Sequence, residues 1–246
     1  MTFKNIALQI AYDGTNFSGY QIQKNKRSVQ EEVEKAIKKV TNENIRTFCA
    51  GRTDAGVHAK CQVINFLTNT KIKASKFYFH LQKFLPDDIK AISSREVSLY
   101  FHSRFSAKNK EYHYVINTQK NMHPIYRNYM ENVTYNLNFE LLNEGLNILK
   151  GKHDFKAFML NEKDVIINTE RILKDCKFER KKNKIILEFV AESFLHNQVR
   201  IMSGSLISLS RGQISLDEFK SYLTNPNKKA GPTLKAGGLY LERINY

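Results

Sequence analysis

The chain contains little cysteine, with only Cys49, Cys61 and Cys176 among its 246 residues. Their number is odd and no Cys-x-x-Cys pair occurs, which argues against a disulfide framework and favours reduced thiols inside the cell. The N-terminus lacks an apolar run typical of a signal peptide, and no apolar stretch reaches the length of a membrane span. We therefore expect a soluble, cytoplasmic protein.

Acidic charge is also scarce. Lys and Arg number 39 against 24 Asp and Glu, which gives a formal net charge of +15 and a pI near 9.6. Such an excess predicts a polyanionic partner, nucleic acid first, unless the charge is spread evenly to keep the protein in solution. Phosphate contacts would make that binding weaken steeply with salt.

Several catalytic signatures are missing from the chain. The stretch from Cys49 to Ala59 lacks the Lys-Ser/Thr pair that closes a P-loop. A zinc deaminase would need His-x-Glu and Pro-Cys-x-x-Cys, and neither occurs. His58 has no second His or Cys at ligand spacing, which predicts a loop-supporting hydrogen bond rather than a metal role. No cofactor or metal is expected.

What the chain does contain is a loop suited to a functional site, Cys49-Ala50-Gly51-Arg52-Thr53-Asp54-Ala55-Gly56-Val57-His58-Ala59. Small residues bracket Arg52 and Asp54, so the backbone can turn tightly while two charged side chains project from it. Asp54 could act as a nucleophile or a base. An aspartate in such a turn is often only a cap for its own backbone, and the local pattern leaves both interpretations open.

Residue periodicity predicts two successive α/β units. In the first unit, alternating residues over 6–12 predict a strand, and Ser28 with Glu31 forms a capping box in front of a helix. The expected elements of this unit are strands at 6–12, 62–67, 91–92 and 97–101 and helices at 29–40 and 75–84. Their order is that of a split βαβ arrangement.

The second unit begins near residue 103 with a similar design. Its expected elements are strands at 112–116, 176–179, 185–190 and 239–241, helices at 139–149 and 197–210, and a short helix that starts after Ser215 and ends at Asn225-Pro226. We expect an α+β fold with one domain over residues 1–103 and another over 104–246.

Two parts of the second unit carry notable charges. In the helix at 197–210, four apolar residues form a buried stripe and Arg200 lies beside it; they are Val199, Met202, Leu206 and Leu209. The hairpin tip from Arg180 to Lys184 carries four basic residues, which fit either a solvated turn or a phosphate contact.

Five further motifs are distributed along the chain. They are Tyr12-Asp13-Gly14-Thr15-Asn16-Phe17-Ser18-Gly19-Tyr20-Gln21, Lys110-Glu111-Tyr112-His113-Tyr114, Gly151-Lys152-His153-Asp154-Phe155, Ser193-Phe194-Leu195-His196-Asn197-Gln198-Val199-Arg200 and Gly238-Leu239-Tyr240-Leu241. Together with the stretch from Cys49 to Ala59, this set resembles the motifs of the tRNA pseudouridine synthase A family. Six motifs in the family's order are very hard to obtain by chance.

The resemblance implies the pseudouridine synthase fold, in which two ferredoxin-like or RRM-like α/β units join their antiparallel sheets across a central basic cleft. It also implies a homodimer that converts uridine to pseudouridine at positions 38 to 40, in the anticodon stem-loop of tRNA. The alternative is a non-catalytic tRNA-binding module that acts as an RNA chaperone, although the aromatic run of an RRM-type binding strand is absent.

The resemblance assigns roles to five residues. Asp54 is implied as the essential carboxylate, which could add to C1′, add to the uracil ring or abstract a ribose proton. A carboxylate in a site that excludes water needs a cation to stay ionised, and Arg200 matches the family residue that pairs with it in two-point contact. Arg52 is implied to assist flipping of the nucleotide, Tyr112 to stack on the uracil, and Leu239 to cover it.

Two features of the motifs leave questions open. Alternation places Tyr114 on the same face as Tyr112, so one of the two belongs to ordinary core packing. Leu234-Lys235 stands where the family usually has Ala-Pro before its Gly-Leu. This departure predicts a more mobile loop over the uracil, or a different contact with RNA, and bears on which tRNA positions are used.

Overall fold

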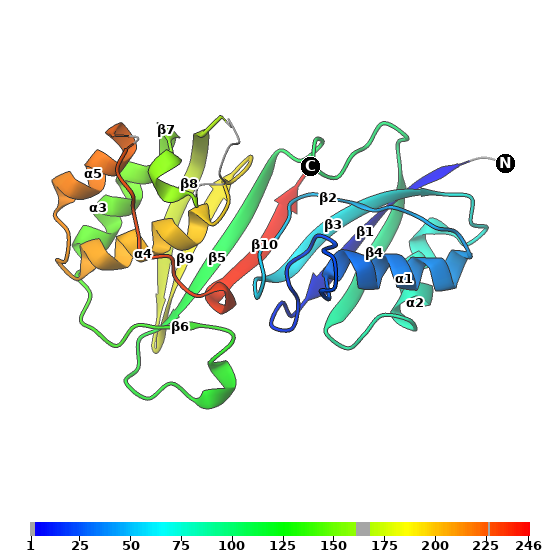
Figure 1. Cartoon of the computed structure of the whole chain (residues 1–246), viewed down its shortest axis with the longest axis horizontal. Helices are drawn as coiled ribbons and strands as arrows, with labels where there is room; N and C mark the ends of the chain where they lie inside the picture. The colour runs from blue at the N-terminus through cyan, green and yellow to red at the C-terminus, as the bar shows by residue number, and fades with distance from the viewer. Residues whose placement is uncertain (1–2, 161–167, 226) are drawn as a thin grey trace. The chain divides into compact units, whose positions relative to one another are not determined.

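The computed structural model of the chain describes residues 3–160, 168–225 and 227–246, which form two compact units (Figure 1). Unit 1 comprises Met1–Lys108 with Tyr240–Tyr246, and unit 2 comprises Asn109–Leu239. Both combine helices with mostly antiparallel strands, which confirms the predicted α+β class. The domain boundary at residue 103 stays a prediction, because compactness does not show which segments fold independently. Pro226, the predicted helix breaker, lies outside the described residues.

Unit 1 has the predicted split βαβ order. In chain order it contains β1 (Lys4–Tyr12), α1 (Val29–Thr41), β2 (Phe48–Cys49), β3 (His58–Thr68), α2 (Ala74–Gln82) and β4 (Ile89–Val97), followed by all but the first residue of β10 (Leu239–Asn245). Strand β1 lies between β3 and β4 and is antiparallel to both. Strand β2 pairs antiparallel with β3, and β10 pairs with β3 in parallel.

The core of unit 1 follows from its sequence pattern. On β1, Ile6, Leu8 and Ile10 are completely buried, as alternation predicts. The Ser28 side chain accepts a hydrogen bond from the Glu31 backbone N–H at 3.4 Å, so the predicted cap does begin α1. The Ser28 cap, the apolar stripe of α1 and the alternation of β1 thus all predict the same packed unit.

One predicted strand of unit 1 is wrong. Residues 97–101 were expected to be extended, but β4 ends at Val97 and the Phe101 N–H donates to the Ser98 carbonyl in a turn, at 2.9 Å. Tyr100 is 98% exposed there. The apolar residues of 97–101 suggested a strand, but only Val97 continues the pairing of β4 with β1, opposite Asn5. The adjacent prediction at 91–92 was too short, because pairing with β1 extends β4 back to Ile89.

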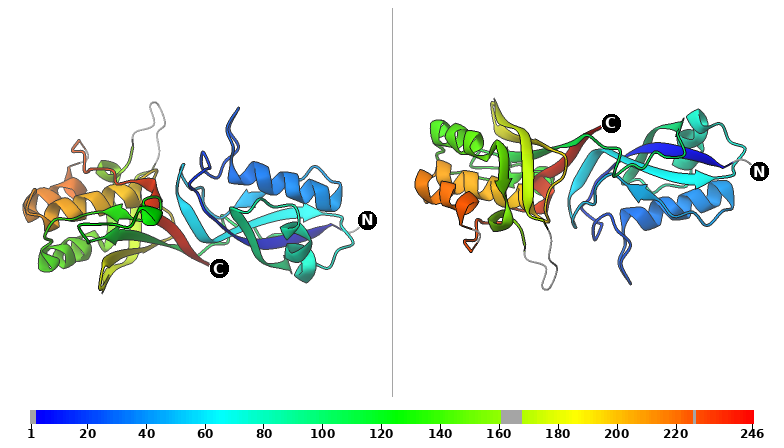
Figure 2. Two further views of the ribbon diagram at one scale, coloured as in Figure 1. Left: turned by 90° about the horizontal axis from the view of Figure 1, so that it is seen from below. Right: turned by 90° about the horizontal axis from the view of Figure 1, so that it is seen from above.

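The α-helices of unit 2 lie on one face of its strands (Figure 2). In chain order it contains β5 (Asn109–Asn117), η1 (Pro124–Tyr126), β6 (Glu131–Asn132), α3 (Phe139–Leu149), β7 (Gly151–Asp154), η2 (Lys156–Phe158), β8 (Glu170–Lys181), β9 (Lys184–Ala191), α4 (Gln198–Ser210), α5 (Leu216–Thr224) and η3 (Ala236–Gly238). Strands β5, β9, β8 and β7 are neighbours in that order and are antiparallel, while β6 pairs with β5 in parallel. On β5, Tyr112, Tyr114 and Ile116 are buried, whereas Glu111 and His113, which point to the opposite face, are half-buried.

Helix α4 is more deeply buried than its sequence predicts. The four residues of the predicted stripe are buried, but so is every other residue of the helix except Arg200. Small residues occupy the faces of α4 outside the apolar stripe, where neighbouring backbone comes close. At Gly204, for example, a Cβ would overlap the Pro232 carbonyl. The helix thus lies against the loop before β10 as well as against the strands.

The three cysteines form no disulfide among the described residues. Cys176 on β8 is buried, its thiol donates to the Leu146 carbonyl, and burial raises the pKa of this thiol to about 12.

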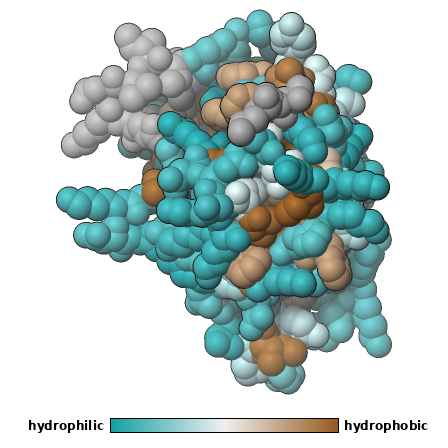
Figure 3. Space-filling model, turned by 90° about the vertical axis from the view of Figure 1, so that its right-hand side faces the viewer, coloured by the Kyte–Doolittle hydropathy of each residue, from teal (hydrophilic) through white to brown (hydrophobic). Residues whose placement is uncertain are grey.

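The end of unit 1 near the N-terminus has a mostly hydrophilic surface interrupted by small hydrophobic areas (Figure 3). Among the helices that the structure describes, none is long and apolar enough to cross a membrane.

Candidate functional site

The loop that carries Asp54 connects β2 to β3, and residues of β3 hold its first residues. The Ala50 N–H donates to the Val63 carbonyl at 2.9 Å, and the Gln62 side-chain amide donates to the Gly51 carbonyl at 2.6 Å. At the turn itself, the Val57 N–H donates to the Asp54 carbonyl at 3.1 Å. Asp54 therefore lies between β elements, as the sequence predicted.

The segment after β1 braces the same loop through Thr53. The hydroxyl groups of Tyr12 and Thr53 lie 2.7 Å apart, and the Tyr20 N–H donates to the Thr53 carbonyl at 3.0 Å. Gly19 has a φ of +98°, and a Cβ there would come within 2.9 Å of that carbonyl oxygen. Burial raises the pKa of Tyr12, so its hydroxyl stays protonated; either hydroxyl can be the donor in this bond.

His58 supports the loop from the start of β3. Its side chain is 3% exposed, and Nδ1 accepts the Gly14 N–H at 3.0 Å while lying 3.1 Å from Asp13 Oδ1. Because Gly14 donates to Nδ1, this nitrogen carries a lone pair and the Asp13 contact is not a second hydrogen bond. The ring also stacks on Tyr240 of β10, with centroids 4.9 Å apart. The predicted loop-supporting role of His58 is confirmed.

Gly14 provides a direct test of this bracing. A Cβ at this position would overlap the Val57 carbonyl, and the backbone cannot yield there without moving the turn after Asp54. We expect Gly14→Ala to lower the free energy of unfolding by about 3 kcal/mol, as overpacking against a backbone does. The measurement is urea denaturation followed by circular dichroism.

Gly212→Ala is the matched control for Gly14→Ala. Gly212 has a φ of +69° and open space around its Cβ position, so this change costs only backbone strain, about 1 kcal/mol. An equal loss of stability in both variants would contradict the close approach of Gly14 to Val57.

Asp54 is half-buried and Arg52 is exposed. The loop bonds described above use backbone groups of the loop or the side chain of Thr53. A rigid loop that presents a carboxylate and a guanidinium two residues apart can place one group on an electrophilic carbon and the other on a phosphate.

In unit 2, Arg200 lies in the first turn of α4 and is half-buried. Its Nε donates to the Leu234 carbonyl at 2.8 Å, and its Nη1 donates to Asn197 Oδ1. Asn197 is the N-cap of α4 and has a φ of +60°, a conformation that asparagine tolerates better than most residues. The Asn197 side chain does not cap the helix, because it accepts from Arg200 instead.

Tyr112 and Tyr114 share one face of β5, as predicted, but differ in their surroundings. Tyr112 is 7% exposed and its ring meets Phe194 edge-on, with centroids 5.1 Å apart. Tyr114 is completely buried, and its hydroxyl donates to the Lys235 carbonyl at 2.7 Å. Tyr114 therefore belongs to the core; Tyr112 is buried as well, and its stacking on uracil stays a prediction.

Leu239 is buried and begins β10 directly after the Gly231–Gly238 loop. That loop is the one whose Leu234 carbonyl accepts from Arg200. Unit 2 thus brings Arg200 together with the segment leading to Leu239, while unit 1 holds Arg52 and Asp54 on one loop. The pairing of Asp54 with Arg200 joins residues of different units and stays a prediction.

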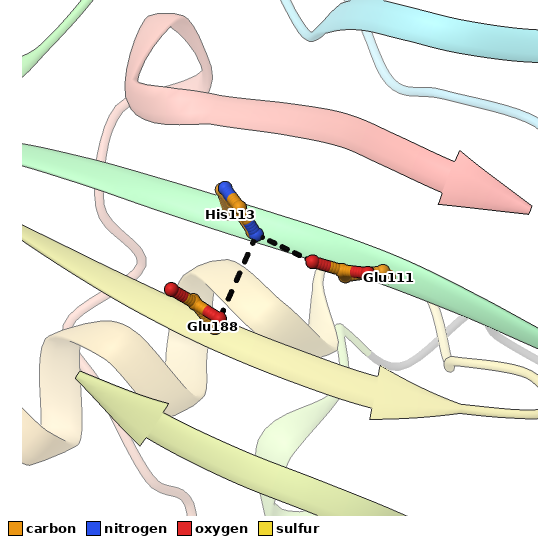
Figure 4. A group of neighbouring side chains, drawn as sticks. All are labelled: Glu111, His113 and Glu188. Atoms are coloured by element: carbon orange, nitrogen blue, oxygen red, sulfur yellow. Dashed lines mark hydrogen bonds and ion pairs between the residues drawn. The ribbon is translucent and has the colours of Figure 1, made fainter. Parts of the chain in front are cut away.

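One cluster that the sequence did not indicate lies on the half-buried face of β5 and β9 (Figure 4). Glu111, His113 and Glu188 each offer one ligand atom, and these atoms lie within 4.8 Å of one another. His113 Nε2 is 2.8 Å from Glu111 Oε1 and 3.9 Å from Glu188 Oε2, and Lys177 Nζ is 3.3 Å from Glu188 Oε2. Lys177 supplies positive charge beside Glu188, and a His113 ring nitrogen contacts Glu111, so these residues form a network of polar contacts on the strand surface.

The basic hairpin tip between β8 and β9 is partly neutralised. Lys181 Nζ lies 3.0 Å from Glu179 Oε2, and the Arg180 guanidinium lies 4.5 Å from the centre of the Phe139 ring. A solvated turn and a phosphate contact both stay predictions for this tip.

Comparison with known proteins relates these motifs to one family. Residues 8–106 and 146–246 match the family model described as tRNA pseudouridine synthase. The chain is 43% identical to tRNA pseudouridine synthase A of Thermoanaerobacter sp. (strain X514), over 99% of this chain and 100% of that protein. The proteins of the same name from Finegoldia magna and Clostridium acetobutylicum are each 41% identical, over the same shares of the chains.

Proposed function

This chain belongs to the tRNA pseudouridine synthase family and is an isomerase that converts uridine to pseudouridine in tRNA, and we propose that its targets lie at positions 38 to 40 of the anticodon stem-loop. The observation that carries the assignment of its carboxylate is the Asp54 loop, which β3, Tyr12 and the segment after β1 hold while the Asp54 side chain is half-buried. Asp54 is the essential carboxylate of the reaction.

The reaction moves the uracil from an N1–C1′ bond to a C5–C1′ bond. The proton on C5 is lost and N1 gains one, so the product is an isomer of the substrate and no oxidant or reductant is needed. A carboxylate suffices for this chemistry, either by attack on C1′ or on the ring, or by removing a ribose proton. The assigned residues require no cofactor.

A uridine in a stem must leave its stack before a carboxylate can reach it, at a cost of a few kcal/mol. Arg52 supports this step because it is exposed two residues before Asp54, where it can fill the vacated space or hold a flanking phosphate. Tyr112 offers its ring to the flipped uracil, a contact worth about 1–3 kcal/mol, and Leu239 covers the base.

Arg200 is the cation that keeps Asp54 ionised. A planar guanidinium suits a carboxylate in two-point contact, and the bonds from Nε and Nη1 to Leu234 and Asn197 fix its plane in unit 2. The roles proposed for these residues are catalytic. We therefore do not propose the non-catalytic RNA chaperone as a second function.

The chain's partners follow from the same assignment. tRNA is the polyanion that the net charge of +15 predicts. We propose that the enzyme works in the cytoplasm as a homodimer, which its mass in solution will test, since the resemblance implies two chains.

The target positions can be tested with tRNA transcripts labelled with tritium at C5 of uridine. We expect tritium to appear in water when uridine occupies position 38, 39 or 40, because the C5 proton leaves only at a converted residue. Replacement of all three by cytidine should stop the release. Release that persists from such a transcript would contradict the anticodon stem-loop as the target while leaving the isomerase activity in place.

A further inference from the structure

The Gly231–Gly238 loop, which precedes Leu239, is closely fitted to the body of unit 2. Its Gly231 N–H donates to the Ser205 hydroxyl of α4 at 3.0 Å. A Cβ at Gly237 would overlap the Asn128 carbonyl, and one at Gly238 would come within 2.8 Å of the buried Tyr114 ring. The loop therefore has few alternative conformations. A change in a residue that binds the loop is expected to shift its backbone.

Glu131 on β6 is a buried carboxylate that anchors this loop. It is 8% exposed, its Oε2 accepts the Lys235 N–H at 2.8 Å, and its Oε1 accepts the Asn132 N–H at 3.1 Å. Each oxygen of the Glu131 carboxyl group thus accepts a backbone N–H, which satisfies this buried polar group.

Tyr114 holds the same point of the loop from β5. Its hydroxyl donates to the Lys235 carbonyl at 2.7 Å and lies 3.3 Å from Glu131 Oε2. Burial and then the nearby Glu131 charge raise the pKa of Tyr114, so the hydroxyl stays protonated and remains a donor.

The peptide group between Leu234 and Lys235 connects Glu131 to Arg200. Its N–H belongs to Lys235 and donates to Glu131, and its C=O belongs to Leu234 and accepts from Arg200 Nε at 2.8 Å. The two ends of a trans peptide point in opposite directions, so this one peptide spans from the carboxylate to the guanidinium. A carboxylate on the N–H end also polarises the peptide and strengthens its carbonyl as an acceptor.

We propose that Glu131 is a positioning residue of the isomerisation: through the Leu234–Lys235 peptide it fixes the guanidinium of Arg200. The inference rests on the proposed role of Arg200. It also explains what changes where Leu234-Lys235 replaces the family's usual Ala-Pro. A lysine at position 235 has a backbone N–H that Glu131 can accept, and a proline has none. The bonds to Glu131 and Tyr114 tie down the very segment for which the departure predicted mobility.

Glu131→Gln removes the anchor with almost no change in volume. Glutamine has one acceptor oxygen in place of two, so it can satisfy the N–H of Lys235 or that of Asn132 but not both. We expect kcat for tritium release to fall about tenfold, with KM for tRNA changed less than twofold, because the loss concerns orientation rather than RNA affinity. Glu144→Gln on α3 is the matched control, since Glu144 is exposed and the chemical change is the same.

Lys235→Pro tests the route through the peptide. Lys235 has a φ of −60°, which the proline ring adopts without strain, so the change removes the N–H and leaves Glu131 in place. Lys235→Ala is its reference, because alanine loses the same side chain but keeps the N–H. We expect Lys235→Pro to lower kcat about tenfold relative to Lys235→Ala, and Glu131→Gln to add less than twofold in the proline background.

The possible outcomes distinguish failure of the positioning role of Glu131 from failure of the proposed isomerase function. A Glu131→Gln enzyme with the kcat of Glu144→Gln would overturn the positioning role, and so would an equal loss from Glu131→Gln in the proline and alanine backgrounds. If thermal denaturation shows that Glu131→Gln does not fold, the comparison of Lys235→Pro with Lys235→Ala decides alone, and equal kcat values there would overturn the proposal. If the wild type releases no tritium, the proposed function fails before any variant is compared.

Discussion

Asp54→Asn is expected to lower the rate of tritium release from C5 of uridine by a factor of about 10⁴ or more, the scale on which loss of an essential nucleophile acts. An amide has nearly the same volume as the carboxylate, but it cannot serve as a nucleophile or base toward a ribose or ring carbon. The loop should keep its shape, because the Val57 N–H bonds the Asp54 carbonyl, which the substitution leaves unchanged. Binding of tRNA should therefore stay within about threefold of the wild type, less than one hydrogen bond is worth.

The experiment compares tritium release with tRNA retention on filters for the same preparations. Asp217→Asn is the matched control, because the Asp217 side chain on α5 is 96% exposed. Near wild-type release by Asp54→Asn would remove Asp54 from the chemistry. Loss of both binding and release would instead assign Asp54 to the architecture of the loop.

Arg200→Lys should have the second largest effect, a fall in kcat of about 100-fold, since hydrogen bonds to charged groups are each worth about 1.5–3 kcal/mol. The charge is kept, but a lysine cannot donate to the Leu234 carbonyl and to Asn197 Oδ1 as the two nitrogens of Arg200 do. It also cannot offer a planar, two-point contact to a carboxylate.

Single-turnover kinetics with saturating enzyme measure this effect apart from RNA affinity. Arg46→Lys is the control, because Arg46 is exposed in unit 1 and undergoes the same change. Full turnover by Arg200→Lys would remove the assignment of Arg200 as the partner of Asp54. A loss confined to KM would make Arg200 a phosphate contact instead.

Elements with a local signal were predictable from the sequence. Ser28 and Asn138 each accept a backbone N–H at the start of α1 and α3, and the predicted span of α3, Phe139–Leu149, matches the structure. The strand predicted at 97–101 failed because pairing with a neighbour, and not its apolar content, decides whether a segment is a strand. The burial of all but one residue of α4 depends on the loop at Pro232, which no stripe in the sequence encodes.

The same distinction applies to the candidate site. The Asp54 loop is recognisable from its own small residues, and the motif around Arg200 from the family resemblance. Glu131 could not be found in this way, because it stands outside every motif and bonds a residue 104 positions away in the sequence. The sequence around Glu131 does not indicate that this residue binds the Leu234–Lys235 peptide. Only the folded structure shows the contact.

The last strand of the chain has a consequence for biosynthesis. Tyr240 and Leu241 of β10 pair with His58 and Ala59 at the start of β3, and the Tyr240 ring stacks on the histidine that braces the Asp54 loop. A ribosome that has made all of unit 1's other strands must still translate the whole of unit 2 before these residues emerge. The Asp54 loop therefore gains the support of Tyr240 only after the whole of unit 2 has been translated.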